Sequence, residues 1–196
     1  MIRLKKKIQR QERILSSLNK LTYSTSEQIN TIEKLGSDRN ARKVLFELEE
    51  DKLIKSVRRN KKIYFVTNKG NDLIGKGNTR LKRNEIDHSL MRNDLYIKLG
   101  MPDSWKKESR IIINKEVFLI SDARFVRNGI QHYIEIDNKQ TMRTNYDKIK
   151  KYAHLFKVIF RKYNHHPVLI WYTLSDVRKR KLSEACRNYG VKYEVF

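Results

Sequence analysis

The chain has 196 residues, enough for one large domain or two small ones. Lysine and arginine number 44 against 22 aspartates and glutamates, so the formal net charge is +22 and a polyanion such as nucleic acid is the favoured partner. No segment approaches the ~20 apolar residues of a membrane span, and the basic N-terminus lacks the apolar run of a signal peptide. The lone Cys186 excludes an internal disulfide. We therefore expect a cytoplasmic protein without membrane attachment.

The first part of the chain has the pattern of consecutive helices. Apolar residues at helical spacing predict a helix over residues 11–21. Ser24 is followed three residues later by Glu27, a spacing that resembles a capping box, so a second helix is expected to begin there. That helix is expected to stop near Gly36, a plausible C-terminal cap.

A third helix is predicted over residues 38–53, with Ser37 or Asp38 as its N-cap. Its apolar residues form one stripe, so polar side chains near its N-terminus should face outward. That end of a helix is the part that meets base edges and phosphates in the major groove. The candidate DNA-binding residues on this helix are Arg39, Asn40, Arg42 and Lys43.

The apolar period then changes from that of a helix to that of a strand. Residues 53–57 and 63–66 read as two short strands joined by a basic turn. The cationic side chains of this turn, also candidates for DNA contact, are Arg58, Arg59, Lys61 and Lys62. Residues 67–74 resemble the strand-to-helix exit, Thr-x-Lys-Gly-x-x-Leu, that is common in bacterial winged-helix proteins.

Three helices followed by a hairpin with a cationic tip predict an N-terminal winged helix-turn-helix domain over residues 1–77. The alternative is a small three-helix unit whose charges are merely solvated, and some winged helices bind protein instead of DNA. Residues 75–84 read as a flexible basic linker, because they hold two glycines and four cations. A second domain is expected over residues 78–196.

The second domain is predicted to alternate helices and strands, which indicates an α/β arrangement around a mixed sheet. Asn128-Gly129 is a hairpin signal between two of the strands. The expected elements are a helix over 85–99, a loop over 105–109, strands over 110–114, 117–125 and 131–137, a helix over 141–163, a strand over 168–172, a helix over 175–189 and a strand over 191–196. The chain as a whole is expected to be of the α+β class.

Three carboxylates of this domain are candidates for a metal site. Asp122 lies on the second predicted strand, and Glu135 with Asp137 lies on the third, two residues apart and so on one face. Because the hairpin makes these strands neighbours, the three carboxylates are expected to converge. An oxygen-rich cluster of this kind suits Mg²⁺ or Mn²⁺, since like charges held close need a cation. The alternative is that each acid simply pairs with one of the many lysines.

This arrangement resembles the PD-(D/E)xK, or restriction-endonuclease-like, nuclease superfamily. The resemblance makes Asp122 the first metal-binding acid and Glu135 the second. Asp137 stands where that pattern has a lysine, so Lys148 on the following helix is the candidate substitute. Further candidates are Lys139 for the lysine and Glu85 or Asp94 for an extra acid.

The whole chain also resembles the replication-relaxation family, which includes the MobC-type relaxases of mobilisable plasmids. The residues that carry this resemblance are His88, Asn93 and Asp94, the triplet at 121–123, the segment at 133–138, Thr141, Lys148 and Tyr152. The resemblance implies a winged helix followed by a nuclease-like domain. It also implies work on the DNA of a plasmid, phage or other mobile element, in replication, mobilisation or transcription regulation.

Three functions follow as expectations. The first is a double-stranded DNA-binding protein, expected to form a homodimer because winged-helix proteins often read symmetric sites. The alternative is a metal-dependent DNA nicking endonuclease that uses Asp122, Glu135, Asp137 and Lys148 as catalytic residues, with Asp122 and Glu135 as ligands of Mg²⁺ or Mn²⁺. In the third, the second domain docks a replication or transfer protein. Tyr146 and Tyr152 are interpreted as packing residues, because they lie at helical core spacing.

Overall fold

The computed structural model of the protein describes residues 2–77, 82–113 and 115–196, and it is of the α+β class, as expected. Residues 78–81 of the predicted linker and residue 114 of a predicted strand lie outside the described residues. The described chain contains seven α-helices and two sheets, of three and five strands. In these segments no helix is both long enough and apolar enough to cross a membrane.

The chain divides into two compact units, Met1–Lys98 and Leu99–Phe196. The boundary expected from sequence lies at residue 77, whereas the boundary in the structure lies after Lys98. The two boundaries therefore differ by one segment. It holds η1 (Arg83–Glu85) and α5 (Ile86–Lys98). Contacts of α5 explain its place in the first unit. Ile86 shares a small core with Tyr23 and Ile63, and the Asn93 side chain donates a hydrogen bond of 2.6 Å to the Tyr23 carbonyl.

The first unit begins with three helices, α1 (Ile2–Leu21), α2 (Ser26–Glu33) and α3 (Asp38–Glu50). Helix α1 begins well before residue 11, where the apolar pattern first appears. The capping box forms one residue later than expected, because Ser24 belongs to a strand. Thr25 accepts from the Gln28 backbone amide, and the Gln28 side chain accepts from the Thr25 amide. Helix α2 ends at Lys34 in the left-handed conformation, two residues before Gly36.

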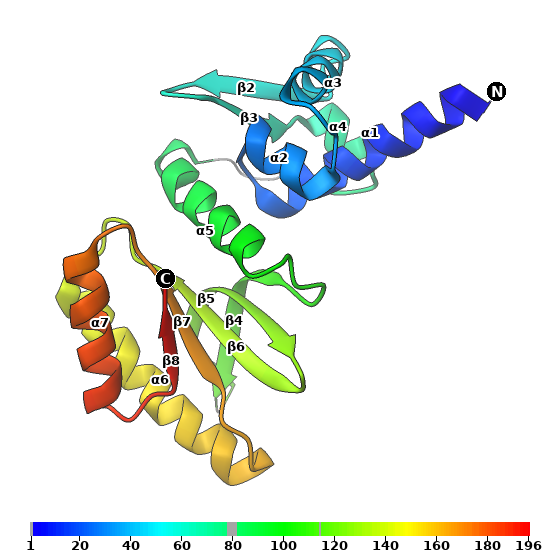
Figure 1. The fold of residues 1–196 in the computed structure, drawn as a ribbon. Coiled ribbons are helices and arrows are strands. Elements are labelled where there is room, and N and C mark those ends of the chain that lie inside the picture. Colours follow the sequence, from blue (N-terminus) through cyan, green and yellow to red (C-terminus); the bar gives the residue numbers. More distant parts are fainter. Residues whose placement is uncertain (1, 78–81, 114) are drawn as a thin grey trace. The chain divides into compact units, whose positions relative to one another are not determined.

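The first unit also contains a small antiparallel sheet beside these helices (Figure 1). Its strands are β1 (Ser24–Thr25), β2 (Ile54–Arg58) and β3 (Lys62–Val66), in the order β1-β3-β2, and α4 (Asn68–Leu73) follows. The hairpin β2–β3 was expected, whereas β1 is too short to leave an alternating pattern. Leu15, Leu18, Leu45 and Leu48 are fully buried in this unit. Burial of each such side chain stabilises the folded state by about 1.5–3 kcal/mol.

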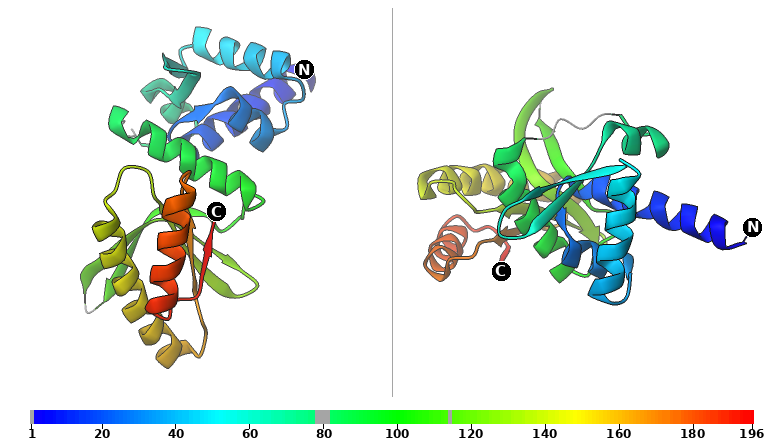
Figure 2. Two further views of the ribbon diagram at one scale, coloured as in Figure 1. Left: turned by 60° about the vertical axis from the view of Figure 1, so that its left-hand side comes forward. Right: turned by 90° about the horizontal axis from the view of Figure 1, so that it is seen from above.

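The second unit is one five-stranded sheet with two helices on one face (Figure 1 and Figure 2). Its strands are ordered β4-β5-β6-β7-β8; the pairs β4–β5 and β5–β6 are antiparallel, and β6–β7 and β7–β8 are parallel. The elements are β4 (Lys106–Ile113), β5 (Glu116–Arg127), β6 (Ile130–Ile136), α6 (Met142–Tyr163), β7 (Val168–Tyr172), α7 (Asp176–Asn188) and β8 (Tyr193–Val195).

Two features of this sheet bear on the site. The predicted loop over residues 105–109 is wrong, because Lys106 and Lys107 already pair with Arg124 and Ala123 and extend β4. The core between the sheet and the two helices contains the fully buried Trp171, Tyr152, Ile149 and Leu182, among others. Helix α6 packs in this core against β5 and β6, the strands that carry the candidate acids, because Leu119 and Tyr133 belong to the same cluster.

Gly70 in α4 gives a direct test of packing in the first unit. A Cβ atom added there would lie 2.2 Å from the Leu53 carbonyl oxygen and 2.8 Å from Val66 Cγ1. We expect Gly70→Ala to lower the free energy of unfolding by about 1–3 kcal/mol, measured by urea denaturation. Gly77→Ala is the matched control, because nothing lies within 4 Å of its added Cβ. Equal stability of the two variants would contradict the packing described.

Candidate functional site

The cations predicted to contact DNA lie on the surface of the first unit. Ser37 caps α3 by accepting from the Asn40 amide, which fixes where the helix begins. The buried stripe of α3 is Ala41, Val44, Leu45 and Leu48. This stripe leaves the other faces outward, so the four predicted residues of α3 and the four of the β2–β3 turn are all exposed.

Half of these eight side chains are already engaged within the protein. The Asn40 side chain donates to the Leu35 carbonyl at 2.7 Å and so holds the α2–α3 turn. Arg59 donates to Asp87 at 2.8 Å and to the Arg83 carbonyl at 2.9 Å. The other two form the ion pairs Lys61–Glu27, at 3.3 Å, and Lys62–Glu49, at 2.6 Å.

The remaining four cations have no hydrogen-bond or ion-pair partner among the described residues. They are Arg39, Arg42 and Lys43 on α3, and Arg58 at the end of β2. An unpaired exposed cation keeps its full charge for an external anion and loses no internal contact on binding. These four are therefore the strongest candidates for contact with a polyanion.

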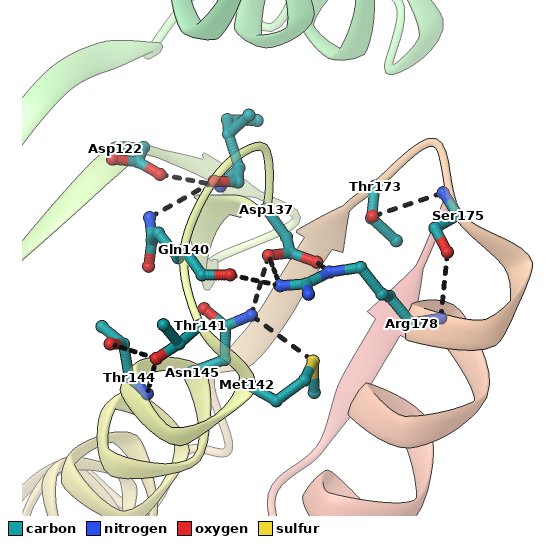
Figure 3. Close-up of polar contacts among 11 residues, drawn as sticks. Asp122, Asp137, Gln140, Thr141, Met142, Thr144, Asn145, Thr173, Ser175 and Arg178 are labelled. Atoms are coloured by element: carbon teal, nitrogen blue, oxygen red, sulfur yellow. Dashed lines mark hydrogen bonds and ion pairs between the residues drawn. The ribbon is translucent and has the colours of Figure 1, made fainter.

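The acids of the second unit lie on adjacent strands. Asp122 is on β5 and Glu135 on β6, and the register pairs Ala123 with Ile134 and Arg124 with Tyr133. Because opposite residues of an antiparallel pair share a face, one further step along this register places Asp122 beside Glu135. Asp122 is fixed by the Ile136 backbone amide, which donates to its Oδ2 at 2.7 Å (Figure 3).

Glu135 is fully buried and held from α6 by two side chains. The Tyr152 hydroxyl donates to Oε1 at 2.6 Å, and Lys148 Nζ lies 2.5 Å from Oε2. Lys148 and Tyr152 are four residues apart, one helical turn, so both face the sheet. The structure thus brings together Asp122, Glu135 and Lys148. Tyr152 packs in the core, as its helical spacing predicts, and its hydroxyl adds a polar contact to that packing.

The electrostatics of this group follow from burial and from the two neighbouring acids. Burial and the negative charge of Asp122 raise the pKa of Glu135 to about 8, against the opposing effects of Lys148 and Tyr152. Burial alone would lower the pKa of Lys148, but the charges of Glu135 and Asp122 outweigh it and raise that pKa. Lys148 therefore keeps its proton beside two acids whose charges would repel each other if both were ionised.

The group opens to the surface on the Lys148 side. A hollow there is lined by residues 117–120 of β5 and, from α6, by Thr144, Asp147, Lys148 and Lys151. The Lys148 side chain is 21 % exposed, whereas that of Glu135 is 0 % exposed. A ligand in the hollow would therefore meet the ammonium group of Lys148 before it met Glu135.

Asp137 lies in a different environment, at the point where the chain leaves β6 (Figure 3). Arg178 of α7 contacts both of its oxygens at 2.5 Å, and the Asn145 side chain donates to Oδ1 at 2.8 Å. Burial raises the pKa of Asp137, but the hydrogen bonds from Arg178 and Asn145 outweigh this effect and lower it. The same guanidinium also donates to the Gln140 carbonyl at 2.7 Å.

The expected convergence of three carboxylates is not seen. Among the described residues, no group of three or more His, Cys, Asp or Glu side chains is placed to hold a metal ion. The physical reason is that β6 ends at Ile136, so the alternation of side chains that would align Asp137 with Glu135 stops. Of the further candidates, Glu85 pairs with Lys82 at 2.9 Å and Asp94 accepts from Gln28 at 2.6 Å, both in the first unit, and Lys139 is exposed.

Sequence reasoning missed Asn145 and Arg178, which hold Asp137, and it gave the Tyr152 hydroxyl no contact with Glu135. The spacing of Lys148 and Tyr152 was a usable signal, since a lysine and a tyrosine one turn apart share a face. Arg178 left no comparable signal. It lies 41 residues from Asp137, and only the parallel crossover between them brings the two together.

The chain matches the family model described as replication-relaxation over residues 15–169. This match covers most of the chain, and the protein belongs to the replication-relaxation family, which confirms the resemblance at the family level. Membership associates the chain with replication or with the function of mobile elements. No curated protein matches the sequence significantly.

The Asp137–Arg178 pair predicts a large effect of one substitution. Arg178→Ala would leave a buried carboxylate without its counter-charge, so we expect the free energy of unfolding to fall by about 3–5 kcal/mol. Lys179→Ala is the control, because its pair with Asp176 spans 3.5 Å and the Asp176 side chain is 91 % exposed. Such a surface pair contributes at most about 1 kcal/mol. Chemical denaturation measures both, and equal losses would contradict this reading.

The raised pKa of Glu135 predicts how stability changes with pH. The folded protein binds this proton more tightly than the unfolded chain, so the contribution is complete below pH 4.5 and is lost as pH rises through about 8. We expect wild-type stability to fall across this window by up to about 1.4 kcal/mol per pH unit, measured in EDTA.

Glu135→Gln should flatten that pH slope, because an amide does not titrate. Glu184→Gln, which changes an exposed glutamate of α7, should leave the slope as in wild type. If Glu135→Gln keeps the wild-type slope, another group is responsible and the assignment to Glu135 fails.

Proposed function

We propose that the first unit is a winged-helix domain that binds double-stranded DNA. The observation that carries this proposal is the set of exposed cations without internal partners, three on α3 and one on the β2–β3 hairpin. The order of helices and strands also supports it, since α3 follows a short turn after α2 and the hairpin follows α3. In a winged helix these are the parts that enter the major groove and contact the backbone.

The biological setting proposed is a plasmid, phage or other mobile element in the cytoplasm. Family membership supports a role in replication, in mobilisation or in transcriptional control of these processes. A homodimer on a symmetric site is the expected form, because two half-sites double the contacts without a new binding surface. A replication or transfer protein is a further expected partner.

The DNA-binding proposal predicts that Arg42→Gln with Lys43→Gln weakens duplex binding at least tenfold. If these side chains contact phosphates, the slope of log affinity against log salt should also fall by about two. The control is Lys106→Gln with Arg110→Gln on β4, which removes the same charge from two exposed positions of the second unit. Fluorescence anisotropy over a salt series measures both. If the two double variants weaken binding equally, the protein attracts DNA only through its net charge, and the proposed contact by α3 is contradicted.

A second candidate function is metal-dependent nicking of DNA by a PD-(D/E)xK-type site in the second unit. The specific observation in its favour is Lys148, which supplies from α6 the cation that the strand position of Asp137 lacks. The pairing of Asp122 on β5 with Glu135 on β6 supports the same reading.

Asp122 and Glu135 offer carboxylate oxygens, the ligand type that a divalent cation prefers, whereas Asp137 is bound by Arg178 instead. Burial and the neighbouring charge of Asp122 raise the pKa of Glu135, so an added positive charge would relieve the repulsion between the two acids. Asp122 and Glu135 would hold Mg²⁺ or Mn²⁺, which when bound lowers the pKa of a coordinated water and polarises a phosphate. Lys148 would hold a phosphate oxygen at the hollow, and Tyr152 would keep Glu135 oriented. Asp137 is proposed to position the end of β6.

Nicking is tested on supercoiled plasmid with Mn²⁺ or with EDTA. Catalysis at this site predicts conversion to open circles only with Mn²⁺, and a loss of at least a hundredfold in Asp122→Asn and Lys148→Met. Asp176→Asn, an exposed position of α7, should cut as wild type. A mobility shift without any cleavage would rule out nicking and leave the DNA-binding proposal intact.

A further inference from the structure

Phe46 is an apolar side chain left in water on the side of α3 that carries the cations. It is 59 % exposed, and among the described residues of the first unit it is the only exposed aromatic residue. Phe46 follows Lys43 by three positions and Arg42 by four, so the three side chains are neighbours on the helix surface. Arg39 precedes Phe46 by seven positions, two helical turns, and lies on the same side.

Contacts on both flanks of α3 leave this side of the helix open. On one flank, Lys7 of α1 pairs with Glu47 at 3.3 Å. On the other flank, Glu49 accepts from the Ser56 hydroxyl at 2.6 Å and pairs with Lys62, and both partners lie on the β2–β3 hairpin. At about 100° per residue, the arc between the two flanks faces away from the buried stripe. The arc holds five exposed residues, Arg39, Arg42, Lys43, Phe46 and Glu50.

The surroundings of Phe46, more than its exposure, indicate a function. Single apolar residues are common on protein surfaces and need no explanation. Phe46 differs because it lies among three cations, Arg39, Arg42 and Lys43, that have no hydrogen-bond or ion-pair partner in the part of the chain that the structure describes. A ligand held by these cations would also cover the ring. Such a ligand must offer anionic groups and, between them, an apolar group.

We propose that Phe46 selects thymine in the major groove by packing its ring against the 5-methyl group of one base. The inference rests on the DNA binding proposed for the first unit, and it adds which base α3 selects. In the major groove only thymine presents a methyl group, whereas the other base edges present hydrogen-bond donors and acceptors. A phenyl ring forms no such hydrogen bonds and would leave those polar edges without partners.

The position of Phe46 along α3 fits this role. The N-terminal part of a recognition helix contacts base edges, and α3 begins at Asp38. From Arg39 to Phe46 the helix rises by about 10 Å, or about three base-pair steps. Glu50 lies one turn beyond Phe46, and its carboxylate would repel phosphates. The contact is therefore expected to end near Phe46, with the cations on the backbone and the ring on one base pair.

Duplexes that contain uracil test this proposal, because deoxyuridine pairs with adenine as thymidine does and lacks only the methyl group. The wild-type full chain first selects its preferred duplex from a pool of random sequences. Each thymine of that duplex is then replaced in turn by deoxyuridine, and binding is measured by fluorescence anisotropy. We expect at least one replacement to weaken binding about fourfold, the value for burial of one methyl group.

Three variants show whether Phe46 is responsible for this preference. Phe46→Ala should bind the thymine and uracil duplexes alike and keep the wild-type salt slope, because the phosphate contacts of the cations remain. Phe46→Leu keeps an apolar group and should retain a preference for thymine. Leu73→Ala is the matched control, because it removes another exposed apolar side chain of the first unit, and it should behave as wild type.

Equal affinity of the wild type for every uracil-substituted duplex would overturn the proposal, as would a thymine preference that Phe46→Ala retains in full. If Phe46→Ala changes the oligomeric state in analytical ultracentrifugation and leaves the thymine preference intact, the ring serves contact between chains and the proposal is wrong. Absence of any duplex binding by the wild type would contradict the DNA-binding proposal itself. Duplex binding without dependence on the methyl group would contradict only the role of Phe46.

Discussion

The ion pair between Asp137 and Arg178 is the interaction on which the second unit's site depends. The carboxylate lies just after β6, and its partner comes from α7, so one buried contact ties the end of a strand to a helix 41 residues away. Asn145, in the first turns of α6, holds the same carboxylate. The contact therefore fixes how β6, α6 and α7 meet. The Ile136 amide that orients Asp122 and the Glu135 side chain both lie within two residues of it.

Asp137 and Glu135 are two residues apart, yet their pKa values shift in opposite directions. Burial raises both, but Arg178 and Asn145 outweigh it at Asp137, whereas the charge of Asp122 adds to it at Glu135. Two acids whose negative charges are not balanced by their neighbours are the arrangement expected where a cation binds. An acid whose charge is balanced by hydrogen-bonded partners is the arrangement expected of a structural contact. This contrast supports the two proposed roles, in which Glu135 binds a cation and Asp137 positions the end of β6.

Much of this fold was predictable, since it depends on local patterns. The helical spacing of apolar residues located α6, and the Asn128-Gly129 signal located the hairpin that makes Asp122 and Glu135 neighbours. Where prediction failed, a nonlocal contact decided the outcome. Residues 106–109 belong to a strand because they pair with β5, and α5 belongs to the first unit because it packs there. Asp137 lies beyond the end of β6 and binds Arg178 instead of joining the other two acids.

For the second unit, the proposal to test is that Asp122 and Glu135 form one cation site, and calorimetric titration of the metal-free protein with Mn²⁺ tests this proposal most directly. The account predicts one site per chain, with binding that strengthens as pH rises toward about 8 because Glu135 must lose its proton. It also predicts loss of binding in Asp122→Asn and in Glu135→Gln. No heat of binding at millimolar Mn²⁺, or equal binding by wild type and both variants, would contradict it.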